Sequence, residues 1–149
     1  GNPDHCMRFE NTDIKQNDWL ITNPINCSGV ENLKVNFNHL YSANKVPPKL
    51  YYTNQYNGNA SQSTWTELSY SFGENENQWY PSEDFIIENP DDVLYFAFHY
   101  EAAANEGAYF LLDNFNVERK YATLNDGDLM IIQNYVFNKV LINIKELIN

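Results

Sequence analysis

Three pairs of acidic residues near the middle of the chain are the first candidates for chemistry, because paired carboxylates hydrolyse glycosidic bonds when they face each other across a cleft. One carboxyl group of such a pair must have a raised pKa, which requires burial or a nearby like charge. The pairs are Glu74 and Glu76, Glu83 and Asp84, and Asp91 and Asp92. All of them stand among turn-forming Asn, Gly, Ser and Pro residues, so we expect solvated loops and no catalysis.

The histidines also give no support for nucleophilic or metal-dependent chemistry. The chain has three, His5, His39 and His99, at no spacing that is typical of a zinc site. The sequence contains no nucleophile elbow and no glycine-rich phosphate loop. His39 shares one face of an alternating segment with Val35 and Phe37, which predicts a buried, hydrogen-bonded imidazole. The sequence therefore predicts a protein that is not an enzyme.

Asp113 differs from the paired acidic residues because it lies within an apolar segment, residues 111–117. A buried carboxylate must be hydrogen-bonded, paired with a cation or bound to a metal. We therefore expect Asp113 to have a specific partner, either backbone N–H groups that close a loop or a cation.

The chain is strongly acidic, with a net charge of −11 and only 9 Lys and Arg residues among 149. Nucleic acids and anionic membranes bind to cationic surfaces, so neither is an expected partner. No apolar run is long enough to insert into a membrane as a spanning helix. Acidic charge keeps a domain soluble, and it is also compatible with Ca²⁺, which prefers carboxylate and carbonyl oxygens.

Cys6 and Cys27 are the only cysteines of the chain. Two cysteines do not complete a zinc site, and their spacing is not that of a Cys-x-x-Cys redox motif. Both stand in strand-like segments, so we expect buried thiols that behave as small hydrophobic residues. A disulfide between them is the alternative in an oxidising compartment.

Short apolar runs alternate with turn-forming residues along the chain, which is typical of a β-sandwich. Aromatic residues, which favour strands, make up 15% of the chain. No alternation of strands with helices is evident, so the predicted fold class is all-β. The expected strands are 6–10, 19–22, 33–39, 50–53, 65–72, 84–87, 94–100 and 108–118.

Two of these segments have informative patterns. Residues 33–39 alternate, with Leu33, Val35, Phe37 and His39 on one face, which predicts a half-buried strand. Residues 94–100 are apolar on both faces, as expected of a central strand. The composition changes after residue 118, so we expect the sandwich in residues 1–118 and a linker with a C-terminal segment in residues 119–149. Apolar residues near the C-terminus fit a strand and a helix, and periodicity leaves both open.

Five short motifs follow one another along residues 18–118. They are Asp18-Trp-Leu-Ile-Thr-Asn-Pro-Ile-Asn-Cys-Ser-Gly29, Val35-Asn-Phe-Asn-His-Leu-Tyr41, Thr64-Trp-Thr-Glu-Leu68, Leu94-Tyr-Phe-Ala-Phe-His-Tyr100 and Leu112-Asp-Asn-Phe-Asn-Val117. In this order they resemble the motifs of bacterial choice-of-anchor J domains, which are relatives of the cleaved-adhesin domains.

The resemblance implies a jelly-roll β-sandwich, similar to galactose-binding-like domains and carbohydrate-binding modules. It implies a protein that is secreted or associated with the outer membrane of a Gram-negative bacterium, usually as one module of a longer chain. It also implies that Asp113 lies near an edge of the sandwich, where such folds sometimes hold structural calcium. Asp18 is expected in the same region, so Asp18 and Asp113 are the candidate calcium ligands.

The chain departs from the family pattern at both ends. The family begins with a Phe-Glu-Ser strand some distance before the Trp-Leu-Ile motif, and only residues 6–10 are available for it here. Residues 133–143 are similar to the start of a type IX secretion sorting domain, although Gln-Asn-Tyr stands in place of its Pro-Asn-Pro. The alternative for this segment is a terminal strand or helix that packs on the sandwich.

Aromatic residues in or beside the expected loops are the candidate ligand contacts. They are Tyr51, Tyr56, Trp79 and Tyr80. Exposed aromatic rings stack on sugars and also anchor protein partners. Together with the resemblance, they predict a non-catalytic, adhesin-like binding or accessory module at the cell surface, with a glycan or a surface protein as partner. The alternative is a carbohydrate-binding module of a secreted hydrolase.

Overall fold

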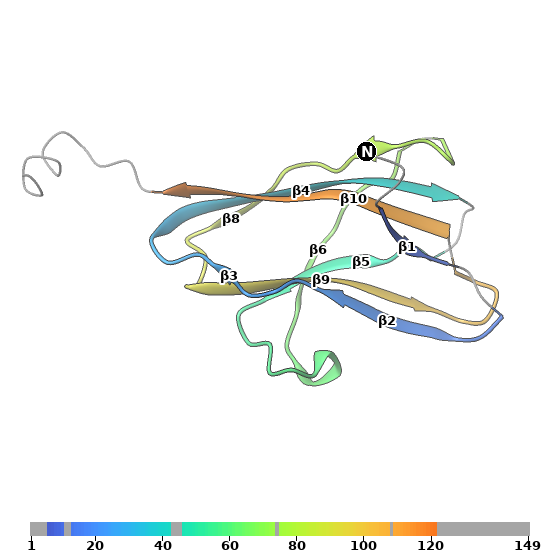
Figure 1. Ribbon diagram of the computed structural model, residues 1–149, viewed down its shortest axis with the longest axis horizontal. Helices are drawn as coiled ribbons and strands as arrows, with labels where there is room; N and C mark the ends of the chain where they lie inside the picture. Colours follow the sequence, from blue (N-terminus) through green and yellow to red (C-terminus); the bar gives the residue numbers. More distant parts are fainter. Residues whose placement is uncertain (1–5, 11–12, 43–45, 74, 108, 122–149) are drawn as a thin grey trace, which may run out of the picture.

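The computed structural model describes residues 6–10, 13–42, 46–73, 75–107 and 109–121. Their strands form two antiparallel sheets that face each other (Figure 1). The described residues contain no α-helix, and nothing among them has the length and hydropathy of a membrane-spanning helix. The predicted all-β class is confirmed for this part of the chain, and the two sheets are consistent with a β-sandwich.

The first sheet is built around two long strands. β4 (Val30–Ser42) and β10 (Tyr109–Tyr121) pair antiparallel along nearly their whole length. β1 (Met7–Phe9) borders β10 on its other edge. β7 (Tyr80–Pro81) and β8 (Phe85–Glu88) both border the free edge of β4, one after the other.

The second sheet is built around β9 (Val93–Ala102), which has neighbours on both edges. β2 (Gln16–Ile21) and β3 (Ile25–Asn26) follow each other along one edge of β9. β5 (Lys49–Thr53) pairs with the other edge, and β6 (Thr66–Leu68) borders β5. The prediction that residues 94–100 form a central strand is therefore confirmed.

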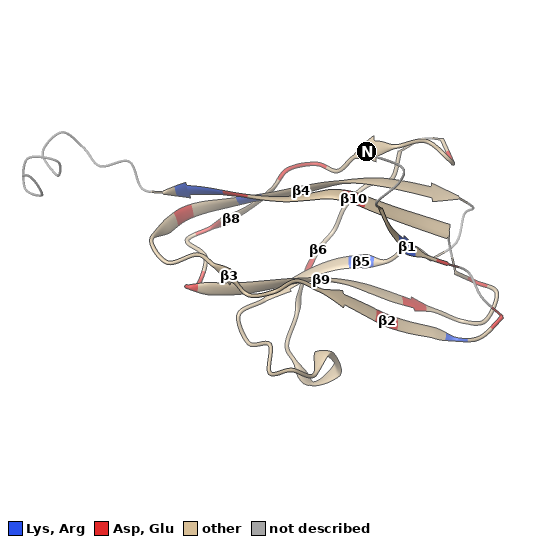
Figure 2. Cartoon of the chain, in the orientation of Figure 1, with Lys and Arg blue, Asp and Glu red and all other residues tan. Residues whose placement is uncertain are grey.

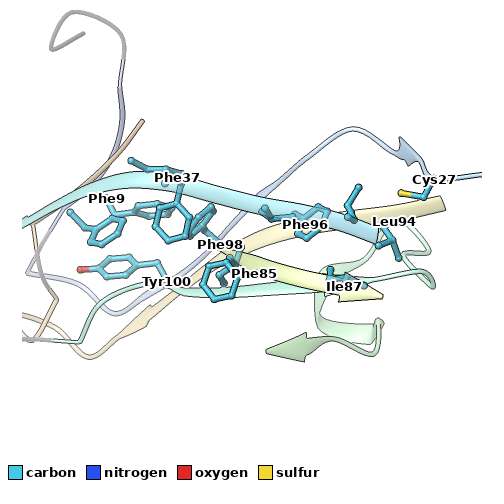
Figure 3. Close-up of a cluster of buried hydrophobic side chains, with 14 of the residues drawn as sticks. Phe9, Cys27, Phe37, Phe85, Ile87, Leu94, Phe96, Phe98 and Tyr100 are labelled. Atoms are coloured by element: carbon cyan, nitrogen blue, oxygen red, sulfur yellow. The ribbon is translucent and has the colours of Figure 1, made fainter. Parts of the chain in front are cut away.

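The core lies between the sheets and consists mainly of aromatic and branched aliphatic side chains (Figure 3). Phe37 of β4 meets Phe98 of β9 edge to face, with ring centroids 5.1 Å apart. Phe9 of β1 meets Tyr100 of β9 at 5.4 Å. Burial of each such side chain stabilises the fold by about 1.5–3 kcal/mol, so these contacts join the two sheets.

The sequence predicted most strand positions but not their lengths. The alternation at 33–39 is confirmed, because its predicted inward face is buried. β3 was expected only as a strand-like segment before Cys27, and β7 was not predicted, since two residues are too few to show a pattern. The strand expected at 65–72 is present only as β6, because Tyr70 and Phe72 leave the sheet edge and pack against His39 of the first sheet.

β10 continues past residue 118, where the sandwich was expected to end. It pairs with β4 as far as Tyr121, and the Lys34 ammonium lies 2.8 Å from the Glu118 carboxylate across this end of the ladder. The polar residues at the end of β10 pair with the first residues of β4, and composition alone does not reveal this pairing. Residues 122–149, including the segment similar to a sorting domain, lie outside the described residues.

His39 is fully buried within a set of aromatic rings. Its imidazole is parallel to the ring of Phe110, and the rings of Tyr70 and Phe72 approach it edge-on. The expected burial is confirmed, but neither ring nitrogen has a hydrogen-bond partner in the described part of the chain. Burial lowers the pKa of His39 below its ordinary value, and the Glu83 carboxylate opposes this shift.

The low pKa of His39 predicts a loss of stability in mild acid. As the pH falls below the ordinary value of 6.5, the unfolded chain binds a proton at this position before the folded chain does. The free energy of unfolding should therefore fall between about pH 7 and pH 5, and less steeply in His39→Phe than in the wild type. Urea titrations across this range measure both slopes, and both proteins keep His99, whose pKa is also lowered by burial, so the difference between the slopes isolates the effect of His39. Equal slopes for His39→Phe and the wild type would contradict the prediction.

The two cysteines should differ in reactivity. Neither is bridged; Cys27 is 1% exposed, whereas Cys6 is partly exposed. Burial raises the pKa of the Cys27 thiol, although Arg119 opposes the shift, so thiolate is scarce and shielded there. A thiol reagent should label one cysteine in the folded protein and the second only after denaturation. Cys6→Ser should remove the fast reaction. Failure to label either thiol in denaturant would instead indicate a disulfide.

Candidate functional site

The outer face of the second sheet carries a continuous group of aromatic side chains. β9 places Phe96 and Phe98 in the core, so the alternating residues Tyr95 and His99 face away from it. Trp19 on β2 lies directly opposite His99 in the antiparallel register. Six half-buried rings form what we call the outer aromatic cluster: Trp19, Tyr51, Tyr56, Trp65, Tyr95 and His99.

The rings of this cluster contact one another in a series, stacked around Trp19 and tilted elsewhere. The rings of Trp19 and His99 are nearly parallel, at 11°, with centroids 3.9 Å apart. Trp65 stacks with Trp19 at 5.3 Å and 29°. Tyr56 continues the series from Trp65 to Tyr95, at 6.0 and 5.2 Å. The cluster is therefore a series of stacked and tilted rings and not a flat, coplanar row.

The loop between β5 and β6 supplies two of the rings and projects from this sheet (Figure 1). Its 3₁₀ turn, η1 (Ala60–Gln62), is capped by the Asn59 side chain, which accepts a hydrogen bond from the Ser61 N–H at 3.1 Å. The Trp65 indole N–H donates to the Ala60 carbonyl at 2.9 Å. Hydrogen bonds within the loop thus hold the Trp65 ring against Trp19.

Charged groups are absent from this loop. Residues 54–65 contain no Asp, Glu, Lys or Arg in a chain of net charge −11, and the loop is uniformly tan in Figure 2. Its polar groups are Asn, Gln, Ser and Thr side chains, several of which bond to one another. The side of the outer aromatic cluster that this loop forms is therefore polar and uncharged.

An ion pair borders the cluster beside Tyr51. The Lys49 ammonium and the Tyr51 hydroxyl both donate to the Glu67 carboxylate, at 3.0 and 3.3 Å. Burial, followed by the charge of Glu67, raises the pKa of Tyr51, so its hydroxyl stays protonated. Burial lowers the pKa of His99, whose Nε2 lies 2.8 Å from the Asn17 amide oxygen. At neutral pH the rings of Tyr51 and His99 are uncharged, and each has a hydrogen-bonded polar group.

The predicted ligand contacts separate into two groups. Tyr51 and Tyr56 belong to the outer aromatic cluster, whereas Tyr80 lies in β7 of the first sheet and Trp79 directly precedes it. The Tyr80 ring is 6.4 Å from that of His39, and its hydroxyl accepts a hydrogen bond from the Asn75 N–H. The other members of the cluster were not predicted from the sequence, because the pairing of Trp19 with His99 depends on the register of β2 and β9.

The candidate calcium ligands lie along one side of the sandwich. Asp113 lines a cavity between the sheets, and Asp18 is an exposed residue of β2 that lines a neighbouring cavity. Ca²⁺ takes about six to eight oxygen ligands. No group of three or more His, Cys, Asp or Glu side chains suited to a metal occurs within the described ranges. Calcium binding by Asp18 and Asp113 stays a prediction.

The acidic pairs occupy solvent-facing positions as far as they are described. Glu76, Glu83, Asp84, Asp91 and Asp92 are exposed, and Glu74 lies outside the described residues. Two of these carboxylates contact asparagine amides: Asp84 accepts from Asn36 at 2.6 Å, and Asp91 accepts from Asn54 at 2.8 Å.

Comparison of the sequence with protein-family models and with curated proteins gives no match. The resemblance to choice-of-anchor J domains is therefore carried by the motifs alone.

Removal of the Trp65 ring should loosen the loop between β5 and β6. Trp65→Ala eliminates the hydrogen bond to Ala60 and the contacts with Trp19 and Tyr56. We expect a loss of about 1–3 kcal/mol in the free energy of unfolding and faster amide hydrogen exchange at Ser61. Trp79→Ala, a half-buried tryptophan beside the other sheet, is the matched control. Unchanged exchange at Ser61 in Trp65→Ala would show that the ring does not hold the loop.

Proposed function

We propose that the chain is a non-catalytic binding module and that its ligand contacts the outer aromatic cluster. The observation that supports this proposal is the position of the cluster. Its rings lie on the face of the second sheet that points away from the core, where they are only half buried. Aromatic groups gathered on an outer face are characteristic of interaction sites.

The scaffold suits a binding role. Trp19, Tyr51, Tyr95 and His99 stand on strands, which fix their positions, and only Tyr56 and Trp65 come from the loop. Sites built on rigid elements hold their geometry before the ligand arrives, which lowers the entropy cost of binding. The proposed role requires ligand recognition only, and four rings on strands together with two rings from one ordered loop are sufficient for it.

The proposed function includes a fold type and a cellular location for the module. The five motifs that resemble choice-of-anchor J domains support a jelly-roll type of sandwich in a secreted or cell-surface, adhesin-like protein. Two five-stranded antiparallel sheets are compatible with that fold type. A module of this kind would present the cluster and its loop to the surroundings of the cell.

A specific observation favours a glycan as the ligand over a charged surface protein. The cluster is bordered by an uncharged loop of Asn, Gln, Ser and Thr residues and by two exposed ion pairs, Lys49 with Glu67 and Lys15 with Glu101, in which the charges are paired. Sugars offer an apolar ring face for aromatic contact and hydroxyl groups for hydrogen bonds to amides and carboxylates. Because the rings are not coplanar, we favour a short or branched soluble glycan over the flat surface of a crystalline polysaccharide. A carbohydrate-binding module of a secreted hydrolase would use the same surface.

The glycan proposal predicts binding that depends on the outer aromatic cluster. The wild-type chain should bind members of a glycan array, and calorimetry with the best of them should show at least a tenfold weaker affinity for Tyr56→Ala and Tyr51→Ala. Loss of a central aromatic contact costs about 2 kcal/mol or more at many interfaces, which corresponds to such a change. Trp79→Ala should bind as the wild type does.

Two results would contradict the proposal. Glycan binding that survives both tyrosine substitutions would place the site elsewhere. Turnover of glycan or peptide substrates by the purified chain, lost on substitution of a carboxylate, would show that the module is catalytic. Absence of any glycan binding at millimolar concentrations would remove the carbohydrate version, and cluster-dependent binding to a surface protein would then be expected.

A further inference from the structure

A second candidate site lies on the side of the sandwich, apart from the outer aromatic cluster. A cavity of about 320 Å³ opens there between the two sheets. Its walls are mostly apolar and include Leu20, Phe96 and Phe98 from the second sheet and Leu112 and Phe115 from the first. Small-molecule pockets range from about 300 to 1,000 Å³, so this cavity is suited to one side chain or a small ligand.

A β-bulge in β10 places an acidic residue at the cavity. The pairing of β10 with β4 shifts register between Asp113 and Asn116, and Asn114 has a φ of +52°. Bulges reorient side chains locally and are frequent beside functional sites. In an uninterrupted strand, successive side chains would point to opposite faces of the sheet. The bulge interrupts this alternation, and the consecutive residues Asp113 and Asn114 both line the cavity.

The two carboxylate oxygens of Asp113 are in different situations. Oδ1 accepts a hydrogen bond from the Asn114 backbone N–H at 2.7 Å. Oδ2 is buried and has no hydrogen-bond partner among the described residues. A buried carboxylate oxygen without a partner is unfavourable, so this position is prepared to accept one strong donor.

The cavity continues into a more polar one. A neighbouring cavity of about 430 Å³ shares Met7 and Leu20 with it and is also lined by Asp18, Glu10, Arg8 and Trp19, so it extends to the border of the outer aromatic cluster. Arg8 pairs with Glu10 at 2.8 Å, whereas Asp18 makes no ion pair within the described part of the chain. The two cavities run beside β1 and β2, the outermost strands of their sheets. Together they form an acidic groove next to strand edges that can accept an extended segment.

We propose that this lateral groove binds an extended segment of a partner protein, and that Asp113 receives the ammonium group of a lysine from that segment. The four-carbon stem of lysine is apolar and matches the walls formed by Phe98, Leu112 and Phe115. Only one oxygen of Asp113 is available, which suits the point charge of lysine. Arginine binds carboxylates best through both oxygens at once. The negative charge of Asp18 and of the whole chain favours a basic partner.

The test compares three blocked pentapeptides with the sequence Thr-Val-X-Val-Thr, in which X is lysine, norleucine or arginine. Calorimetry with the full chain should show that the lysine peptide binds at least tenfold more tightly than the norleucine peptide. This difference should disappear in Asp113→Asn, which keeps the shape of the side chain and its acceptor for the Asn114 N–H. Asp18→Asn, an exposed site in the neighbouring cavity, should retain at least part of the preference for lysine.

Backbone amide resonances locate the binding. The lysine peptide should shift the amide signals of Asn114 and Phe115, and the same shifts should occur in Trp65→Ala, which separates this site from the proposed glycan surface. If Asp113→Asn does not fold, the comparison of the lysine and norleucine peptides on the wild-type chain still tests whether the site recognises the ammonium group.

Several outcomes would overturn the proposal. Equal affinity for the lysine and norleucine peptides would show that Asp113 takes no part. Tighter binding of the arginine peptide would show that the single available oxygen of Asp113 does not select lysine over arginine. Binding of n-butylamine as tight as that of the lysine peptide would assign the cavity to a small amine instead of a partner protein. Shifts confined to other surfaces, or no binding at millimolar peptide, would exclude the site.

Discussion

The pairing of β4 with β10 is the interaction on which the described structure depends. It joins residues 30–42 to residues 109–121, which are far apart in the chain, and every other strand of the first sheet attaches to one of the two. Each backbone hydrogen bond in such a ladder contributes about 0.5–1.5 kcal/mol, so the stability of the pairing comes from the number of these bonds and from the side chains that the ladder aligns. The inward row of β4, from Leu33 to His39, and Phe110 and Leu112 of β10 form one wall of the core.

β9 has the corresponding position in the second sheet, but it serves two surfaces. Its inward residues, from Leu94 to Tyr100, pack in the core, and Tyr95 and His99 on its other face belong to the outer aromatic cluster. The same strand therefore determines the stability of the fold and the arrangement of the candidate ligand surface. The inter-sheet contacts of Phe98 hold in place the backbone from which His99 projects, so the core fixes the cluster without contributing residues to it.

The sequence predicted features that depend on local pattern and missed those that depend on strand pairing. The alternation at 33–39 and the apolar run at 94–100 predicted a half-buried and a central strand, because each is visible within one segment. The stack of Trp19 on His99 joins residues that only the register of β2 and β9 brings together. The bulge at Asp113 arises where β10 has one residue more than β4 over the same span, and a single strand does not reveal this difference. Tyr51 and Tyr56 were selected for their place beside a loop, and the same criterion selected Trp79 and Tyr80, which the fold places with the other sheet.

The distribution of tryptophan has a consequence for spectroscopy. The chain has three tryptophans, and none is a member of the buried core: Trp19 and Trp65 stand in the outer aromatic cluster, and Trp79 precedes β7. Intrinsic tryptophan fluorescence therefore reports mainly on the outer surface, whereas the interior contributes through Tyr100 and several phenylalanines. A change in emission need not signify unfolding, since displacement of the loop between β5 and β6 would alter it while the sheets stay intact. Far-ultraviolet circular dichroism, which reports on the backbone of the sheets, separates displacement of the loop from unfolding when it is recorded beside the emission spectrum.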